Sequence, residues 1–257
     1  MANTLTKIIG AGLLGITGFL SGCATMDCGL KPADNLTVSE KKPVTVQGYA
    51  WERVTSDTVL GSGKIVGNGP SSETYLEARV GNDKFNVAGS TWSVFSLMDG
   101  KNSEQDYTFE TRLKLSDSIT VGVDPALWTT QTADVFVGKF PIIYNHDGTT
   151  AAFKPMVDLR NGGVLYVGSL GKTFPVEGTD VSITPRTCIG YADDFLGGNG
   201  LMHVTPGVSA HLGKIGAIDV LGDVNYQFGF NGRKDIVYGG INFEIRTGKV
   251  PLSGEKK

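Results

Sequence analysis

The chain has 257 residues, of which 36 are glycine, and a formal net charge of −3 with 19% charged residues. This charge balance provides no basic surface for nucleic acid, so no nucleic-acid partner is expected. The mean hydropathy of −0.03 excludes a helical membrane bundle. It is compatible with membrane β-strands, in which polar and apolar residues alternate.

The first predicted element is an export signal over residues 1–22. Lys7 is the only charged residue before the apolar run Ile8–Leu20. This run is too short for a transmembrane helix, which needs about 20 residues, and it ends in the small residues Ser21 and Gly22. The sequence therefore predicts an exported chain that is cut before Cys23.

The four residues Leu20-Ser21-Gly22-Cys23 resemble the lipobox of bacterial lipoproteins. The resemblance covers roughly a tenth of the chain together with the preceding apolar run. It implies that Cys23 carries a diacylglyceryl thioether, that palmitate-type chains acylate the new amine, and that membrane lipid is the partner of this end. The residue after Cys23 is Ala24 rather than Asp, which by likeness to the enterobacterial sorting pattern implies transport to the outer membrane. The alternative is an ordinary signal peptide followed by a chance cysteine.

Residues 23–42 are predicted to form a lipidated tether, because they are mostly polar and show no sustained periodicity. This segment contains Cys28, and the only cysteine beyond it is Cys188. Export favours oxidation, so Cys28 and Cys188 could form a disulfide. They could equally remain two thiols too far apart to meet, and the sequence leaves both alternatives open.

Residues 43–246 are predicted to form an all-β domain, because apolar side chains recur at every second position. In one run Tyr107, Phe109 and Leu113 share a face, whereas Glu110 and Arg112 occupy the other. Turn pairs separate such runs, and no helical pattern interrupts them. We predict an antiparallel meander of roughly ten to twelve strands closed into a β-barrel, followed by a polar tail over residues 247–257. The alternating runs are residues 107–116, 151–160, 203–212, 218–230 and 237–246. Turn pairs are Asp147-Gly148, Asn161-Gly162 and Asn231-Gly232.

Two architectures fit this periodicity. In a membrane barrel the apolar face meets lipid, whereas in a soluble β-sandwich or lipocalin-like barrel it forms the core. Runs of about nine to thirteen residues and aromatic residues near strand ends favour the membrane barrel. Pro155 and Pro206 argue against it, because proline removes a ladder hydrogen bond and a closed barrel has no edge. So does the polar tail that follows Arg246, because outer-membrane barrels usually end in an aromatic residue.

No catalytic motif, metal site or cofactor site is predicted. Gly61-Ser62-Gly63-Lys64 lacks the spacing of a phosphate loop. His203 and His211 are eight residues apart, about 26 Å along a strand, so they cannot share a metal there. His146 falls in a hairpin turn, and Asp193-Asp194 with Asn199 lacks the spacing of a calcium loop.

An enzyme would need a histidine close to a nucleophile or a carboxylate, and His203 with Asp193 or Asp194 is the one pairing near a shared turn. No motif of a barrel enzyme accompanies it. We therefore expect an outer-membrane lipoprotein with a structural, binding or pore-related role. The alternative is a lipid-anchored soluble β domain that binds a ligand or a cell-envelope protein.

Overall fold

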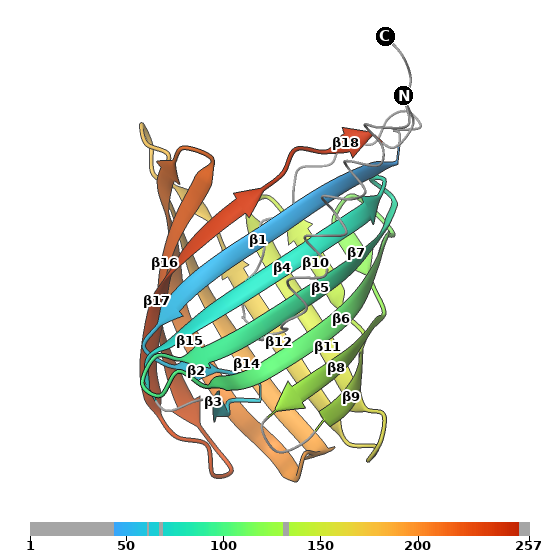
Figure 1. Ribbon diagram of the computed structural model, residues 1–257, viewed down its shortest axis with the longest axis vertical. Helices are drawn as coiled ribbons and strands as arrows, with labels where there is room; N and C mark the ends of the chain where they lie inside the picture. The colour runs from blue at the N-terminus through green and yellow to red at the C-terminus, as the bar shows by residue number, and fades with distance from the viewer. Residues whose placement is uncertain (1–43, 61, 67–68, 131–133, 252–257) are drawn as a thin grey trace.

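The computed structural model describes residues 44–60, 62–66, 69–130 and 134–251, and this part is built of β-strands (Figure 1). Nowhere in these ranges does a helix have the length and apolar character needed to cross a membrane. The strands are β1 (Thr45–Thr55), β2 (Thr58–Val59), β3 (Ile65–Val66), β4 (Ser71–Gly81), β5 (Phe85–Ser96), β6 (Asn102–Lys114), β7 (Ile119–Val121), β8 (Asp124–Thr130), β9 (Asp134–Lys139), β10 (Ile142–His146), β11 (Thr149–Asp158), β12 (Val164–Lys172), β13 (Phe174–Pro175), β14 (Ser182–Phe195), β15 (Gly198–Ile215), β16 (Ile218–Gly229), β17 (Ile236–Arg246) and β18 (Val250–Pro251).

These strands form a closed antiparallel barrel with twelve strand positions. Neighbours pair in chain order, and β1 pairs with β17 to close the wall. Two positions are each filled by two shorter strands, β7 with β8 and β10 with β9. The predicted meander of ten to twelve strands is confirmed, and the alternative of a β-sandwich is wrong because the sheet has no free edge.

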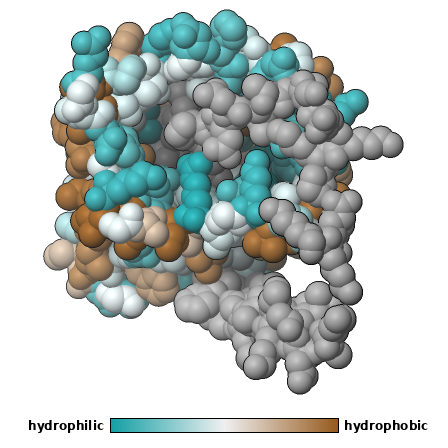
Figure 2. Space-filling view, turned by 90° about the horizontal axis from the view of Figure 1, so that it is seen from above, coloured by the Kyte–Doolittle hydropathy of each residue, from teal (hydrophilic) through white to brown (hydrophobic). Residues whose placement is uncertain are grey.

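Apolar side chains point out of the barrel and charged side chains point into it. In β6, Phe109 is 51% exposed, whereas Glu110 is buried. In β16, Val224 is 62% exposed, whereas the side chain of Asp223 is buried against arginines. Seen from one end, brown hydrophobic residues lie along the outer margin and teal hydrophilic residues gather around the rim (Figure 2). This polarity is opposite to that of a lipocalin-like barrel, so that alternative is also wrong.

Both prolines that seemed incompatible with a closed barrel lie at interruptions of the ladder. Strand β11 pairs with β10 as far as Phe153 and with β9 from Met156 onward, so Pro155 lies at the break between those two strands. Pro206 lies between Val204 and Gly207, where the pairing of β15 with β16 is interrupted. The two prolines lack a backbone N–H, but they lie where the pairing with one neighbouring strand is already interrupted. The wall therefore loses few hydrogen bonds at these positions.

The two ends of the barrel differ in their connections. At the end where β1 begins and β17 ends, which we call the terminal end, most connections are tight turns (Figure 1). One is the predicted turn at Asp147 and Gly148, whose φ angles of 47° and 68° are typical of a hairpin turn. There, a hydrogen bond from Lys172 holds the pKa of Asp147 below its usual range. The opposite, distal end carries the longest connection, residues 56–70.

Candidate functional site: the charged interior

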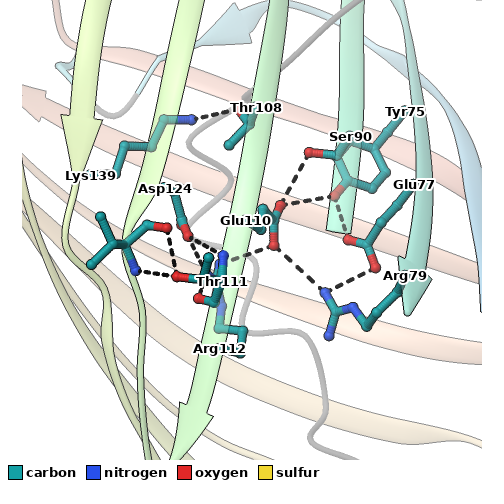
Figure 3. Close-up of polar contacts among 11 residues, drawn as sticks. Tyr75, Glu77, Arg79, Ser90, Thr108, Glu110, Thr111, Arg112, Asp124 and Lys139 are labelled. Carbon is teal, nitrogen blue, oxygen red and sulfur yellow. Dashed lines mark hydrogen bonds and ion pairs between the residues drawn. The ribbon is translucent and has the colours of Figure 1, made fainter. Parts of the chain in front are cut away.

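The interior face of β4, β5 and β6 carries a network that we call the Glu110 cluster (Figure 3). It forms because residues two apart in a strand share a face, and these strands are neighbours. Glu110 Oε1 accepts hydrogen bonds from Ser90 Oγ at 3.2 Å and Tyr75 Oη at 3.3 Å. Its Oε2 lies 3.0 Å from Arg112 Nη2 and 3.6 Å from Arg79 Nη2. The cluster comprises Tyr75, Glu77, Arg79, Ser90, Glu110, Arg112 and Asp124.

A lysine extends this network toward β8 and β9. Lys139 Nζ donates a hydrogen bond to Thr108 Oγ1 at 3.1 Å and lies 5.6 Å from the ring centroid of Trp128. Lys139 is buried, as are Glu104 and Asp106 on the same face of β6. Basic and acidic groups are thus mixed along this wall.

A second network, the Asp223 cluster, joins strands from the two ends of the sequence. Arg53 Nη2 of β1 lies 3.0 and 2.9 Å from the two carboxylate oxygens of Asp223 on β16. Arg53 Nη1 also lies 3.6 Å from Glu73 Oε1. Arg186 Nη2 of β14 lies 3.3 Å from Asp223 Oδ2 and donates to Asn225 Oδ1 at 3.1 Å. Asp223 is therefore held by Arg53 on one side and by Arg186 on the other, whereas Glu73 shares Arg53 with it.

Leu60 and Gly63, in the connection between β1 and β4, lie over the interior at the distal end. Leu60 packs against the interior cluster of Tyr75, Trp92 and Val94. Gln227 Nε2 donates to the carbonyl oxygen of Gly63 at 3.0 Å. Ser62 and Gly63, from the segment that looked like a fragment of a phosphate loop, therefore lie in a packed turn.

Local geometry shows why this turn needs glycine and how tightly it packs. Gly63 has φ +71°, and a Cβ there would lie 3.0 Å from His203 Cδ2. Arg233 Nε donates to the carbonyl oxygen of Ser62 at 3.0 Å. Burial raises the pKa of Asp57 and lowers the pKa of Arg233, so both groups at this end are partly removed from water.

The predicted histidines occupy separate places. His203 Nδ1 lies 2.9 Å from Thr205 Oγ1 inside the barrel, whereas His211 Nε2 lies 2.9 Å from Asp219 Oδ1 near the terminal end. His146 is exposed beside Tyr144. Across the described ranges, no group of three His, Cys, Asp or Glu residues is arranged to hold a metal ion. Asp193 and Asp194 are exposed, and the backbone N–H of Asp194 donates to Asn199 Oδ1 at 2.9 Å.

Cys23 and Cys28 lie outside the described residues, so the lipid and the partner of Cys188 stay predictions. Cys188 itself lies in β14 with its side chain fully buried on the interior face. It is disulfide-bonded. The position of this cysteine inside the barrel could not be predicted from the sequence.

The Asp223 cluster could not be found from the sequence. Arg53 and Asp223 are 170 positions apart, so their contact depends on the closure of the wall by β1 and β17. A usable signal was nevertheless present. Charged residues recur on one face of β4 and of β6, interrupted by Tyr75 and Thr108, which predicts a charged face but not which residues contact each other.

No family model matches the chain, and no curated protein was found with a similar sequence. Several solved structures have a similar fold. The KdgM porin in complex with disordered oligogalacturonate has a TM-score of 0.51 at 8% identity, covering 77% of this chain and 98% of its own. The COG4313 outer membrane channel from Pseudomonas putida F1 has a TM-score of 0.50 at 12% identity, covering 85% of this chain and 100% of its own. At these identities the likeness shows the fold alone: the chain has the closed β-barrel architecture of outer-membrane porins and channels.

Proposed function

We propose that this protein is an outer-membrane lipoprotein whose barrel forms a narrow channel for small polar solutes. The observation that carries the proposal is the polarity of the wall, with apolar side chains outside and ion-paired charges inside. An apolar exterior suits the hydrocarbon of a membrane, and a closed barrel leaves no backbone group unpaired in it. The fold likeness to porins and channels supports the same conclusion.

The lengths of the connections between strands support one orientation of the barrel in the membrane. Membrane barrels have short periplasmic turns and longer extracellular loops. The terminal end would then face the periplasm, where a lipid on Cys23 could insert beside the wall. The distal end would face outside, and Leu60 and Gly63, which lie over the interior there, would narrow that mouth.

The charged side chains of the interior favour the passage of polar rather than apolar solutes. Glu110 faces Arg79, and Asp223 faces Arg53, each on another strand, so charges of both signs line the interior in pairs. Such pairs keep their side chains extended along the wall and offer hydrogen bonds to a passing solute. A channel of this type selects by size more than by net charge.

We expect the purified protein to conduct ions in discrete steps when it is reconstituted in a planar bilayer. The matched variant lacks the β2–β3 hairpin, with residues 57–66 replaced by a short glycine linker, and should show larger steps because the distal mouth is wider. The proposal is wrong if neither protein conducts while both migrate as folded barrels on unheated gels.

We expect Cys23→Ser to abolish metabolic labelling by fatty acid, because the thioether needs the Cys23 sulfur. Signal removal by the lipoprotein peptidase should stop as well. Cys28→Ser is the matched control and should keep the label. Equal labelling of both variants would show that the lipobox resemblance is misleading.

A further inference from the structure

One stretch of the interior wall holds charged groups that do not contact each other. In the cross-strand row through Asp106 of β6, the neighbours on either side are Trp92 of β5 and Trp128 of β8. All three side chains are buried, and Asp106 and Trp92 have no exposed area. Glu104 lies on the same face of β6, and Lys139 approaches it from β9. We call these five residues the Asp106 site.

Most polar groups of the Asp106 site have no partner within the protein. In the described part of the chain, neither carboxylate oxygen of Asp106 accepts a hydrogen bond, and the indole N–H groups of Trp92 and Trp128 donate none. The backbone N–H of Thr129 approaches the carboxylate without reaching hydrogen-bond geometry. Because buried polar groups are nearly always hydrogen-bonded, acceptors and donors gathered in this way need a molecule that bonds to both.

The cation of the site is held away from the carboxylates. Lys139 Nζ donates to Thr108 Oγ1 at 3.1 Å (Figure 3). It also lies 5.6 Å from the ring centroid of Trp128. Lys139 interacts electrostatically with Glu104 and Asp106, yet among the described residues no ion pair joins it to either carboxylate. Opposite charges therefore face each other here without direct contact, unlike those of the Glu110 and Asp223 clusters.

Charges on the distal side of the site do not supply the missing contacts. Glu73 of β4 is held by Arg53, whose Nη1 lies 3.6 Å from Glu73 Oε1. Lys64, in the connection between β1 and β4, interacts electrostatically with Glu104, but its side chain is exposed. Water therefore screens Lys64 more than it screens the buried groups of the site.

Charges on the terminal side are engaged with one another. Lys154 of β11 interacts with Asp124 and Glu110, and like charge repels it from Lys139. Across the described ranges, Lys139 is thus the one buried cation that acts on the two carboxylates of the Asp106 site. The site combines two carboxylates, one ammonium group and two indole N–H groups that are not used up by their neighbours.

We propose that the Asp106 site binds a small zwitterionic solute, a molecule of the α-amino acid type that carries both an ammonium and a carboxylate group. The ammonium group would contact Asp106 and Glu104. The carboxylate group would accept hydrogen bonds from Lys139 and from the indole N–H groups. The inference names a class of solute and rests on the proposed channel, which gives that solute a route to the interior.

A zwitterion fits these groups better than other small molecules do. A buried charge is costly unless a counter-charge contacts it, and this site has unpaired groups of both signs. An amine alone would leave Lys139 without a counter-charge, and a neutral polyol would bring hydrogen bonds but no charge. Tryptophan rings also attract an ammonium group over their faces. A metal ion is not supported, because the described residues include no group of three His, Cys, Asp or Glu arranged to hold one.

The test is NMR spectroscopy of the full folded protein in detergent micelles, with glycine as the probe and the indole N–H signals as reporters. The signals of Trp92 and Trp128 should shift in a saturable way. The signal of Trp51 should not, because Trp51 lies two strands further from Asp106 than Trp92 does. Methylamine and acetate each carry one of the two charges and should bind about tenfold more weakly, the loss expected for one charged hydrogen bond.

Two variants separate the two charges of the site. Asp106→Asn should weaken glycine binding about tenfold, and Lys139→Met should abolish the preference for glycine over methylamine. Asp134→Asn is the matched control, because Asp134 is exposed at the start of β9, and it should bind glycine like the unmodified protein. Each variant is first checked as a folded barrel on unheated gels. If a variant does not fold, the preference of the unmodified protein for glycine over methylamine and acetate still decides.

The proposal is overturned if glycine causes no saturable shift, if methylamine or acetate binds as well as glycine, or if folded Asp106→Asn binds glycine unchanged. Conductance separates this inference from the proposed channel. Glycine should reduce the current through the unmodified protein but not through Asp106→Asn. A barrel that conducts but does not bind glycine keeps the channel and loses the site, whereas one that binds glycine but does not conduct keeps the site and loses the channel.

Discussion

Replacing Arg53 with Met is expected to lower the free energy of unfolding by about 3–5 kcal/mol, the usual loss when one partner of a buried ion pair is removed. The guanidinium lies between Asp223, which it contacts at 2.9 Å, and Glu73, which is fully buried. Methionine fills a similar volume but leaves both carboxylates without this cation. Arg186 still contacts Asp223, so the larger part of the loss should come from Glu73.

The measurement is urea unfolding of the barrel in lipid vesicles, followed by tryptophan fluorescence. Arg160→Met is the matched control, because Arg160 is exposed in the turn after β11, and its effect should stay within about 0.5 kcal/mol. Adding Glu73→Gln to Arg53→Met should restore part of the lost stability, since it removes a buried charge. A loss no larger than that of the control would show that Arg53 is not a structural partner of these carboxylates.

The face assignment of the strands could be predicted from the sequence. The alternation of Phe109 and Leu113 with Glu110 and Arg112 is local, and a β-strand necessarily places such sets on opposite sides. Alternation alone does not show which of the two faces of the sheet becomes the interior of the barrel. The exposure of Val224 and the burial of Asp223 decide this, because the barrel closes around its charges.

The interruptions of the wall were harder to predict. Pro155 counted against a closed barrel because proline removes a ladder hydrogen bond and a closed wall has no edge at which that loss is harmless. The structure divides one wall position into β10 and β9, and the proline lies at that break. Gly122 marks a similar break between β7 and β8, where a Cβ would lie 2.2 Å from the Thr111 carbonyl oxygen. Such close approaches depend on neighbouring strands, so one strand's sequence does not reveal them.

The contents of the interior depend on contacts between distant parts of the chain. Gly63 belongs to the segment that the sequence excluded as a phosphate loop, and its carbonyl oxygen accepts a hydrogen bond from Gln227, 164 residues away. Likewise, Cys188 is buried on the interior face of β14, a position that the local sequence did not predict. A fold that closes β1 against β17 brings all of these residues into one space, and there the function must be sought.

Replacing Val224 with Arg is expected to cost about 2–4 kcal/mol, as for a cation on the lipid face near mid-depth of a membrane barrel. Val224 lies near the middle of β16, and 62% of its surface is exposed. Because the side chain is not part of the core, the substitution tests the surrounding medium. In water, an exposed arginine costs almost nothing, whereas in hydrocarbon it must be desolvated.

The matched control is Met98→Arg, in the turn between β5 and β6 at the distal end. Met98 is 69% exposed but lies outside the strands, so its replacement should change stability by no more than about 0.5 kcal/mol. Both variants are unfolded by urea in lipid vesicles, and their barrels are compared on unheated gels. If Val224→Arg is as harmless as Met98→Arg, the exterior of β16 faces water, and the apolar belt must be covered by something other than a membrane. A selective loss in Val224→Arg means that the same exposed surface is stable only against lipid.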